Sequence, residues 1–201
     1  MLGYSKALSD GDYLLRNMQE VAYGYNRYSY SAVRQYLNSA APLGAWWKPC
    51  DMFDIAPDQL STIAGFLSGC SESFIQVIKP VGVKTYLNTT QDAEIGESET
   101  VYDKVFLPSL EEMYITPQKA GEGDVHEYWK RASGRTEPFA WSTSYPELVH
   151  YAVENHTSAQ SVRLRSAHRN YSCNTWYVNA SGYVAGSNAS TAFRFSPLVV
   201  L

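Results

Sequence analysis

The stretch that decides the fold is SVRLRSAHRNYSCNTWYVNASGYVAGSNASTAFRFSPLVVL, residues 161–201. It contains no Asp, Glu, Lys, Gln or Met, although acidic residues occur throughout the chain before it. Asn, Ser, Tyr, Ala and Gly fill it instead, between a few apolar and arginine positions. This composition predicts a binding surface carried on strands and loops, and residues 1–160 are expected to form the scaffold that holds it.

Apolar and polar residues alternate in two parts of this stretch, with the period of a β-strand. In VRLRSA, residues 162–167, the aliphatic side chains are expected on one face and the arginines on the other. In TWYVNASG, residues 175–182, Trp176 and Val178 share one face and Tyr177 lies on the opposite one. Both segments are therefore predicted strands, with Trp176 pointing into the core.

Turns are predicted at Gly182 and at residues 187–188, where Gly, Ser and Asn favour them. The final segment FRFSPLVVL, residues 193–201, is strongly apolar. We expect it to close the chain as a strand buried in a sheet.

The scaffold is expected to contain helices, strands and long loops. Helical spacing of apolar residues, with proline or glycine at the ends, predicts helices over residues 32–40 and 57–67. Ser109 followed by Glu112 is a capping box, which predicts a short helix after a buried strand end at residues 105–107. Further strands are expected at residues 13–15 and 21–23, and one or two strands over residues 74–87, broken at Pro80–Gly82. Exposed loops are expected at residues 88–100 and 116–136.

Length and charge narrow the class of protein. The 201 residues suit one domain. A net charge of −4 argues against a nucleic-acid partner, which usually requires a basic stripe. No apolar run approaches the roughly twenty residues of a membrane helix, so no transmembrane segment is expected. The N-terminus lacks a basic-then-apolar signal pattern, so the location stays open between the cell interior, a cell surface and a virion.

Residues with catalytic or metal-binding chemistry are present but not in recognisable arrangements. The sequence has no GxSxG, no phosphate-binding glycine loop and no HExxH. His150 and His156 lie six positions apart, and hydrogen-bonded histidines explain them better than metal ligands do. The three cysteines show no CxxC spacing, so reduced thiols are expected at Cys50, Cys70 and Cys173. We therefore expect no enzyme activity, no metal and no cofactor.

The order of several short segments resembles a known group of proteins. These segments are RYSYSAVRQYLNS, DKVFLPSLEEM, VRLRSA, a Trp-x-Val strand with a Gly turn, and RFSP before an apolar end. Together they look like the C-type-lectin-type fold of bacterial and phage proteins related to formylglycine-generating enzymes. Within that group the chain most resembles the variable proteins of diversity-generating retroelements. The resemblance implies an α+β fold with mixed and antiparallel sheets, two or three helices and long loops, in a single domain over residues 1–201.

The resemblance also implies a mechanism of variation. In those systems adenines of a template are copied with errors, so that Asn codons of the AAY type become codons for other residues. Changes in the first two bases cannot produce Lys, Glu, Gln, Met or Trp. Residues 161–201 contain none of these five except Trp176, which would be an unvaried anchor.

Roles follow residue by residue from the resemblance and the strand alternation. The frame is expected to comprise Arg165, Ser166, Trp176, Val178, Val184, Arg194, Phe195 and Pro197. The varied, solvent-facing, ligand-binding positions are expected to be Asn170, Tyr171, Ser172, Cys173, Asn174, Tyr177, Asn179, Ser181, Tyr183, Ser187, Asn188, Ser190 and Phe193. Tyr, Asn and Ser on rigid strands are typical of an adaptable recognition surface.

The sequence thus predicts a non-catalytic ligand-binding protein with a hypervariable C-terminal surface. Its expected partner is a macromolecule, namely a protein or a surface receptor. Two alternatives stay open at this point. One is an oxidase like the formylglycine-generating enzymes, which use a close cysteine pair to hold copper; the other is a structural surface or virion protein.

Overall fold

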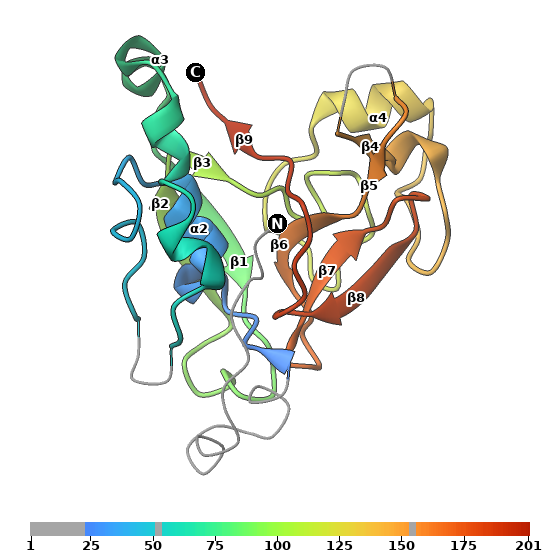
Figure 1. Cartoon of the computed structure of the whole chain (residues 1–201). Helices are drawn as coiled ribbons and strands as arrows, with labels where there is room; N and C mark the ends of the chain where they lie inside the picture. Colours follow the sequence, from blue (N-terminus) through green and yellow to red (C-terminus); the bar gives the residue numbers. More distant parts are fainter. Residues whose placement is uncertain (1–22, 51–53, 153–155) are drawn as a thin grey trace.

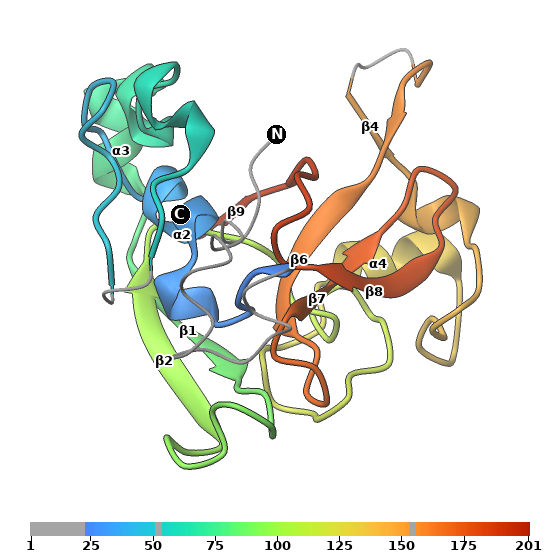
Figure 2. The ribbon, with the colours of Figure 1, turned by 60° about the horizontal axis from the view of Figure 1, so that its bottom comes forward.

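The computed structural model describes residues 23–50, 54–152 and 156–201. The chain forms two halves that lie side by side (Figures 1 and 2). The first half holds η1 (Tyr28–Tyr30), α2 (Ala32–Leu37), η2 (Asp58–Ser61), η3 (Phe66–Gly69), α3 (Glu72–Val77), β1 (Val81–Tyr86), β2 (Ser98–Asp103) and β3 (Val105–Phe106). The second holds α4 (Glu127–Ser133), η4 (Pro146–Leu148), β4 (His150–Tyr151), β5 (Ala159–Gln160), β6 (Val162–Ala167), β7 (Asn174–Val178) and β8 (Val184–Asn188). The chain then returns to the first half as β9 (Leu198–Val199).

The described strands form small antiparallel sheets. β1 pairs with β2, β3 with β9 and β4 with β5, while β6, β7 and β8 make a three-stranded sheet in that order. Short helices and antiparallel sheets confirm the α+β class predicted from the sequence. No helix in the described ranges is long and apolar enough to cross a membrane.

The first predicted helix is present but shorter than expected. Ser31 caps α2, because its hydroxyl accepts a hydrogen bond from the Arg34 backbone N–H at 3.2 Å. The helix ends at Leu37 rather than residue 40. Asn38 follows it, and its side chain accepts from the backbone N–H of Lys104 and donates to the Val105 carbonyl, at 2.8 and 2.7 Å. The residue that ends the helix thus fastens it to β3.

The predicted helix over residues 57–67 is wrong. This segment contains η2 and then leads into η3, and its backbone bonds reach another part of the chain. Gly65 N donates to Ala41 O at 2.9 Å, and Leu67 N donates to Ser39 O at 3.0 Å. A side chain at Gly65 would place its Cβ 2.3 Å from the Ser39 carbonyl oxygen. The close contact with residues 39–41 therefore replaces the helical hydrogen bonds.

Other scaffold predictions are correct in part. Strand was expected over residues 74–87, but the first four of these residues belong to α3, which Ser71 caps. The extended part of this range is β1. The expected loop over residues 88–100 already enters β2 at Ser98, and the expected loop over residues 116–136 contains α4. The strand predicted at residues 13–15 and the first two residues of the strand predicted at residues 21–23 lie outside the described residues. Tyr23, which is described, is helical rather than extended.

The capping box at Ser109 and Glu112 is confirmed, although it begins a turn rather than a helix. Glu112 N donates to the Ser109 hydroxyl at 3.1 Å, and Ser109 N donates to the Glu112 carboxylate at 3.0 Å. The same carboxylate forms a buried ion pair with Arg165 of β6. This ion pair therefore holds the capping turn against β6.

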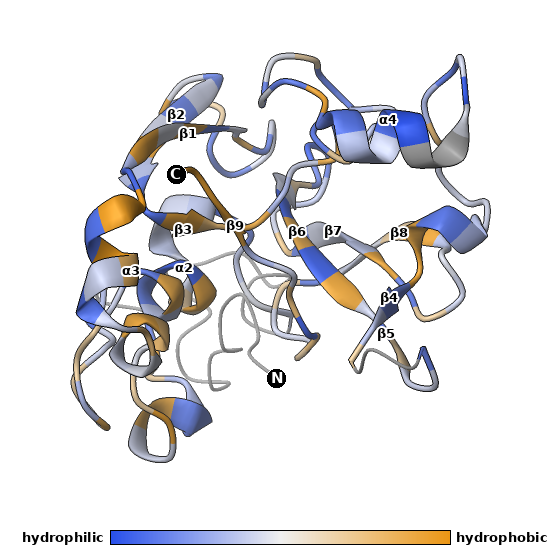
Figure 3. Cartoon of the chain, turned by 90° about the horizontal axis from the view of Figure 1, so that it is seen from above, coloured by the Kyte–Doolittle hydropathy of each residue, from blue (hydrophilic) through white to orange (hydrophobic). Residues whose placement is uncertain are grey.

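The core has two apolar clusters, one in each half. The first includes Tyr28, Val33, Leu37, Leu67, Ile78, Val83, Val105, Phe106, Leu107 and Ala189. The second includes Leu110, Met113, Tyr114, Ile115, Phe139, Leu148, Val162, Leu164, Trp176, Val178 and Val184. The exposed helix α4 is mostly polar, whereas β9 is apolar (Figure 3).

The terminal strand is shorter and less buried than predicted. Only Leu198 and Val199 pair with β3, and Leu201 is 70% exposed. The Lys79 backbone N–H donates a hydrogen bond to the Val200 carbonyl at 2.8 Å. The expectation of a fully buried strand over residues 193–201 is therefore wrong, because β3 offers a ladder of two residues.

Candidate ligand-binding surface

The sheet of β6, β7 and β8 separates a core face from an outer face. In the register of β7 and β8, Trp176 lies opposite Gly186 and Val178 opposite Val184. Trp176, Val178 and Val184 belong to the second apolar cluster. Because side chains alternate along a strand, Tyr177 lies on the other face, opposite Ala185. The alternation predicted for this segment is confirmed.

Arg163 anchors the outer face although its side chain is only 2% exposed. Its guanidinium donates to the Thr175 hydroxyl, to the Asn188 carbonyl at 3.0 Å and to the Thr191 carbonyl at 2.6 Å. These bonds compensate in part for the burial of a charge, which would otherwise be costly. They also fix the turn after β8 against the sheet.

Phe193 covers this arginine and reaches Tyr177. The Arg163 guanidinium carbon lies 4.5 Å from the centroid of the Phe193 ring. The rings of Phe193 and Tyr177 stack with 4.6 Å between centroids and 13° between planes. Both rings stay partly accessible. Two predicted binding residues, sixteen positions apart in sequence, thus form one aromatic platform.

The turn between β7 and β8 continues this surface. The Asn179 side-chain oxygen accepts from Ser181 N at 2.8 Å and from Tyr183 N at 2.9 Å. This is the side-chain turn that Asn favours. Tyr183 and Ser187 lie on the same face as Tyr177 by strand alternation. We define the outer surface as Tyr177, Asn179, Ser181, Tyr183, Ser187 and Phe193.

A second group of predicted residues lies at the other end of the sheet, around the turn between β6 and β7. Asn174 is paired with Asn188 across β7 and β8. Tyr171 is half exposed, and its ring lies 5.0 Å from that of His168. We define the hairpin end as Asn170, Tyr171, Asn174, Asn188 and Ser190.

Asn26 holds the hairpin end in place. Its side-chain amide donates to the carbonyls of His168, Tyr171 and Asn174 at 3.1, 2.9 and 2.7 Å. Its oxygen accepts from Asn88 at 3.0 Å, and its backbone N–H donates to the Ser172 carbonyl at 2.8 Å. One fully buried side chain therefore fixes the backbone of the whole turn.

Ser172 and Cys173 were predicted to face solvent, and this is wrong. They are 1% and 5% exposed. The Cys173 carbonyl accepts from Ala189 N at 2.7 Å, while the Ser172 carbonyl is held by Asn26. These contacts place both residues beneath the turn. The two residues are excluded from the candidate binding surface.

Trp176 is sandwiched between two rings. His168 stacks on it with 5.2 Å between centroids and 10° between planes, and Trp141 lies 4.7 Å away on a tilted plane. The Trp176 indole N–H donates to Gln118 at 3.1 Å. Burial lowers the pKa of His168, so its ring is neutral at pH 7. Trp176 is 4% exposed, as expected for a frame residue.

Among the described residues, no group of three or more His, Cys, Asp or Glu side chains is placed to hold a metal ion. No disulfide joins Cys50, Cys70 and Cys173, all of which are described. They are exposed, half-buried and buried, respectively.

A comparison with protein families matches residues 5–200 to the family described as "Domain of unknown function (DUF6273)". The chain belongs to this family. The DUF6273 match spans the scaffold and the terminal stretch together. No curated protein and no solved structure matches the chain.

Sequence reasoning missed several residues that shape the surface of this DUF6273 domain. Asn26, Trp141 and Gln118 are far from the terminal stretch in sequence and carry no local signal for their contacts. Arg163 was placed correctly on the face opposite Val162, but not identified as an anchor. An arginine between two aliphatic strand residues is itself a signal, since a charge within a sheet needs several acceptors.

Proposed function

We propose that this protein is a non-catalytic ligand-binding protein of the C-type-lectin type, whose outer surface and hairpin end form a recognition site diversified by a retroelement. The stacked pair of Tyr177 and Phe193 above the buried Arg163 carries the proposal. Accessible aromatic rings on a fixed sheet supply contact area with little loss of side-chain entropy.

The ligand class we propose is another macromolecule. The surface extends along two strands and their turns, and it offers rings flanked by small polar groups rather than a deep cavity. Tyrosine and small polar residues of this kind favour protein recognition, with the binding energy concentrated in a few rings. A protein or surface receptor fits this chemistry.

The pattern of natural variation tests the proposal. We expect sequenced copies of the gene to differ at the codons of the outer surface and hairpin end, through changes in the first two bases. Trp176, Val178, Val184 and Arg165 should stay constant. A reverse-transcriptase gene should lie nearby, beside a near-copy of the terminal codons.

Two results would reject diversification. One is variation that falls as often on core-facing codons such as Val178 as on Tyr177. The other is a neighbourhood without a reverse transcriptase and repeat. If the repeat is present but Tyr177→Ala and Phe193→Ala leave binding to an identified partner unchanged, the recognition surface is misplaced.

A further inference from the structure

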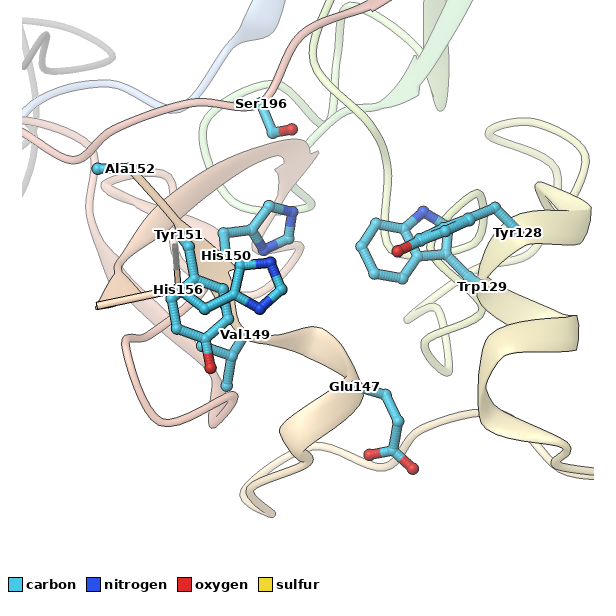
Figure 4. Close-up of a pocket in the computed structure, with 9 residues that line it drawn as sticks. All are labelled: Tyr128, Trp129, Glu147, Val149, His150, Tyr151, Ala152, His156 and Ser196. Atoms are coloured by element: carbon cyan, nitrogen blue, oxygen red, sulfur yellow. The ribbon is translucent and has the colours of Figure 1, made fainter. Parts of the chain in front are cut away.

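A separate concave site lies between α4 and the β4–β5 hairpin (Figure 4). Its volume is about 500 Å³, and it is lined in part by Tyr128, Trp129, Glu147, His150, Tyr151 and Ser196. This volume is in the range of small-molecule sites. The pocket shares no residue with the outer surface or the hairpin end, so what it binds is independent of the proposed recognition function.

Aromatic rings form two sides of the pocket. Tyr128 and Trp129 leave α4 together and meet edge to face, with 5.0 Å between centroids and 81° between planes. Across the pocket, Tyr151 stacks on His156 at 4.5 Å. Tyr128 is 69% exposed and Tyr151 is 42% exposed, so both rings are accessible to a ligand, although His156 covers one face of Tyr151. The faces of such rings carry partial negative charge and attract cations.

The charged groups that line the pocket also favour a cation. Glu147 projects from η4 at one end of the pocket. Among the described lining residues it is the one carboxylate, and none is Lys or Arg. Arg131, also on α4, is bound to Glu127 at 3.0 Å. His150 accompanies Trp129 at 5.5 Å, and its Nδ1 lies 2.9 Å from the Leu148 carbonyl. Burial lowers the pKa of His150, so this ring adds no positive charge at pH 7.

We propose that this pocket binds a small organic cation with a methylated ammonium group, which packs against Tyr128, Trp129 and Tyr151 and is neutralised by Glu147. A primary ammonium is strongly hydrated and requires several hydrogen-bond acceptors. Ring faces do not provide them. A methylated ammonium requires none, and aromatic groups around such a cation are a general mode of its recognition.

Calorimetric titration with choline tests the proposal, with 3,3-dimethylbutan-1-ol as the uncharged analogue of the same shape. We expect choline to bind at least about tenfold more tightly than the analogue, because the charge is what the rings and Glu147 recognise. Glu147→Gln, Tyr128→Ala and Tyr151→Ala should each weaken choline binding by about fivefold. Tyr102→Ala removes a tyrosine of β2 that is more exposed (77%) than Tyr128 or Tyr151, and it should leave binding unchanged.

Phosphocholine distinguishes a free cation from a lipid headgroup. Its phosphate is repelled by Glu147, so we expect it to bind more weakly than choline. Thermal unfolding of each variant checks that the fold is intact. Equal binding of choline and the uncharged analogue would overturn the proposal, as would tighter binding of phosphocholine or of N-acetylglucosamine. No saturable choline binding up to about 10 mM would overturn it as well.

Discussion

Arg165 of β6 and Glu112 of the capping turn form a buried ion pair that holds the strand against the turn. The Arg165 Nη2 donates to Glu112 Oε1 at 2.8 Å, and its Nη1 bonds the other carboxylate oxygen. The same guanidinium donates to the Leu107 carbonyl at 2.8 Å. Burial alone would lower the pKa of Arg165, but the bonds and charge of Glu112 raise it. These bonds of the Arg165 guanidinium fix the position of β6 relative to the capping turn.

Removing one partner of this pair should be costly. We expect Arg165→Met to lower the free energy of unfolding by about 3–5 kcal/mol, because Glu112 stays buried without its cation. Arg131→Met breaks an exposed pair with Glu127 and should cost below about 0.5 kcal/mol. Urea denaturation measures both. The double variant Arg165→Met/Glu112→Gln should recover part of the loss, because the glutamine keeps a capping side chain without the unpaired charge. Equal losses in Arg165→Met and Arg131→Met would contradict the role of the buried pair.

Trp176 and Tyr177 are neighbours on opposite faces of β7, and their substitution should separate core from surface. Trp176→Ala should cost about 3–5 kcal/mol, because it leaves a cavity between His168 and Trp141. Tyr177→Ala should cost about 1 kcal/mol, the contribution of its stack on Phe193. Thermal and urea unfolding check both values. A loss for Tyr177 as large as that for Trp176 would place Tyr177 in the core.

Gly182 is required by both backbone conformation and space. Its φ is +75°, and a Cβ there would lie 1.9 Å from the Tyr145 carbonyl oxygen. We expect Gly182→Ala to cost about 2–4 kcal/mol. Gly134 has a φ of +60° with no atom near its Cβ position, so Gly134→Ala should cost about 1 kcal/mol. Similar stabilities of the two variants would show that the chain around Tyr145 yields easily.

His168 should make the protein less stable in mild acid. Burial lowers its pKa in the folded state below the ordinary 6.5, so the unfolded chain takes up the proton first. Its stabilising contribution is complete above 6.5 and decreases as pH falls from 6.5 through the folded-state pKa. Buried Glu122, whose pKa is raised by burial, acts in the opposite direction as pH rises above 4.5.

The difference between wild type and His168→Gln isolates the histidine. The melting temperatures of wild type and His168→Gln should converge as the pH falls below 6.5. Wild type loses stability there because its unfolded chain takes up a proton at His168, and the variant has no such proton uptake. A gap that widens as pH falls would contradict the assignment.

Local pattern predicted strands at residues 162–167 and 175–182, and the structure has β6 at Val162–Ala167 and β7 at Asn174–Val178. In β7 the alternation coincides with one buried face, whereas β6 is buried on both faces. Local pattern also predicted the capping box at Ser109. It failed where distant backbone decides the structure. The contact of Gly65 with Ser39 replaces a helix with two short turns, and no periodicity in residues 57–67 reports that contact.

The candidate surface was predicted to a similar degree. Tyr177 and Phe193 are accessible, and the structure adds their stacking, which sequence spacing does not indicate. The burial of Ser172 and Cys173 depends on Asn26 and Ala189, which approach from other parts of the fold. Composition alone cannot distinguish a polar residue beneath a turn from one above it.

The hydrogen bonds from Asn26 to the hairpin end affect how much sequence change this region tolerates. All three acceptors of its amide are main-chain oxygens, which every amino acid possesses. Exchanging the side chains of Asn170, Tyr171 or Asn174 therefore leaves those bonds available. Asn26, which lies outside the turn, fixes the backbone conformation of the turn. The side chains of the turn can therefore change while its backbone conformation is kept.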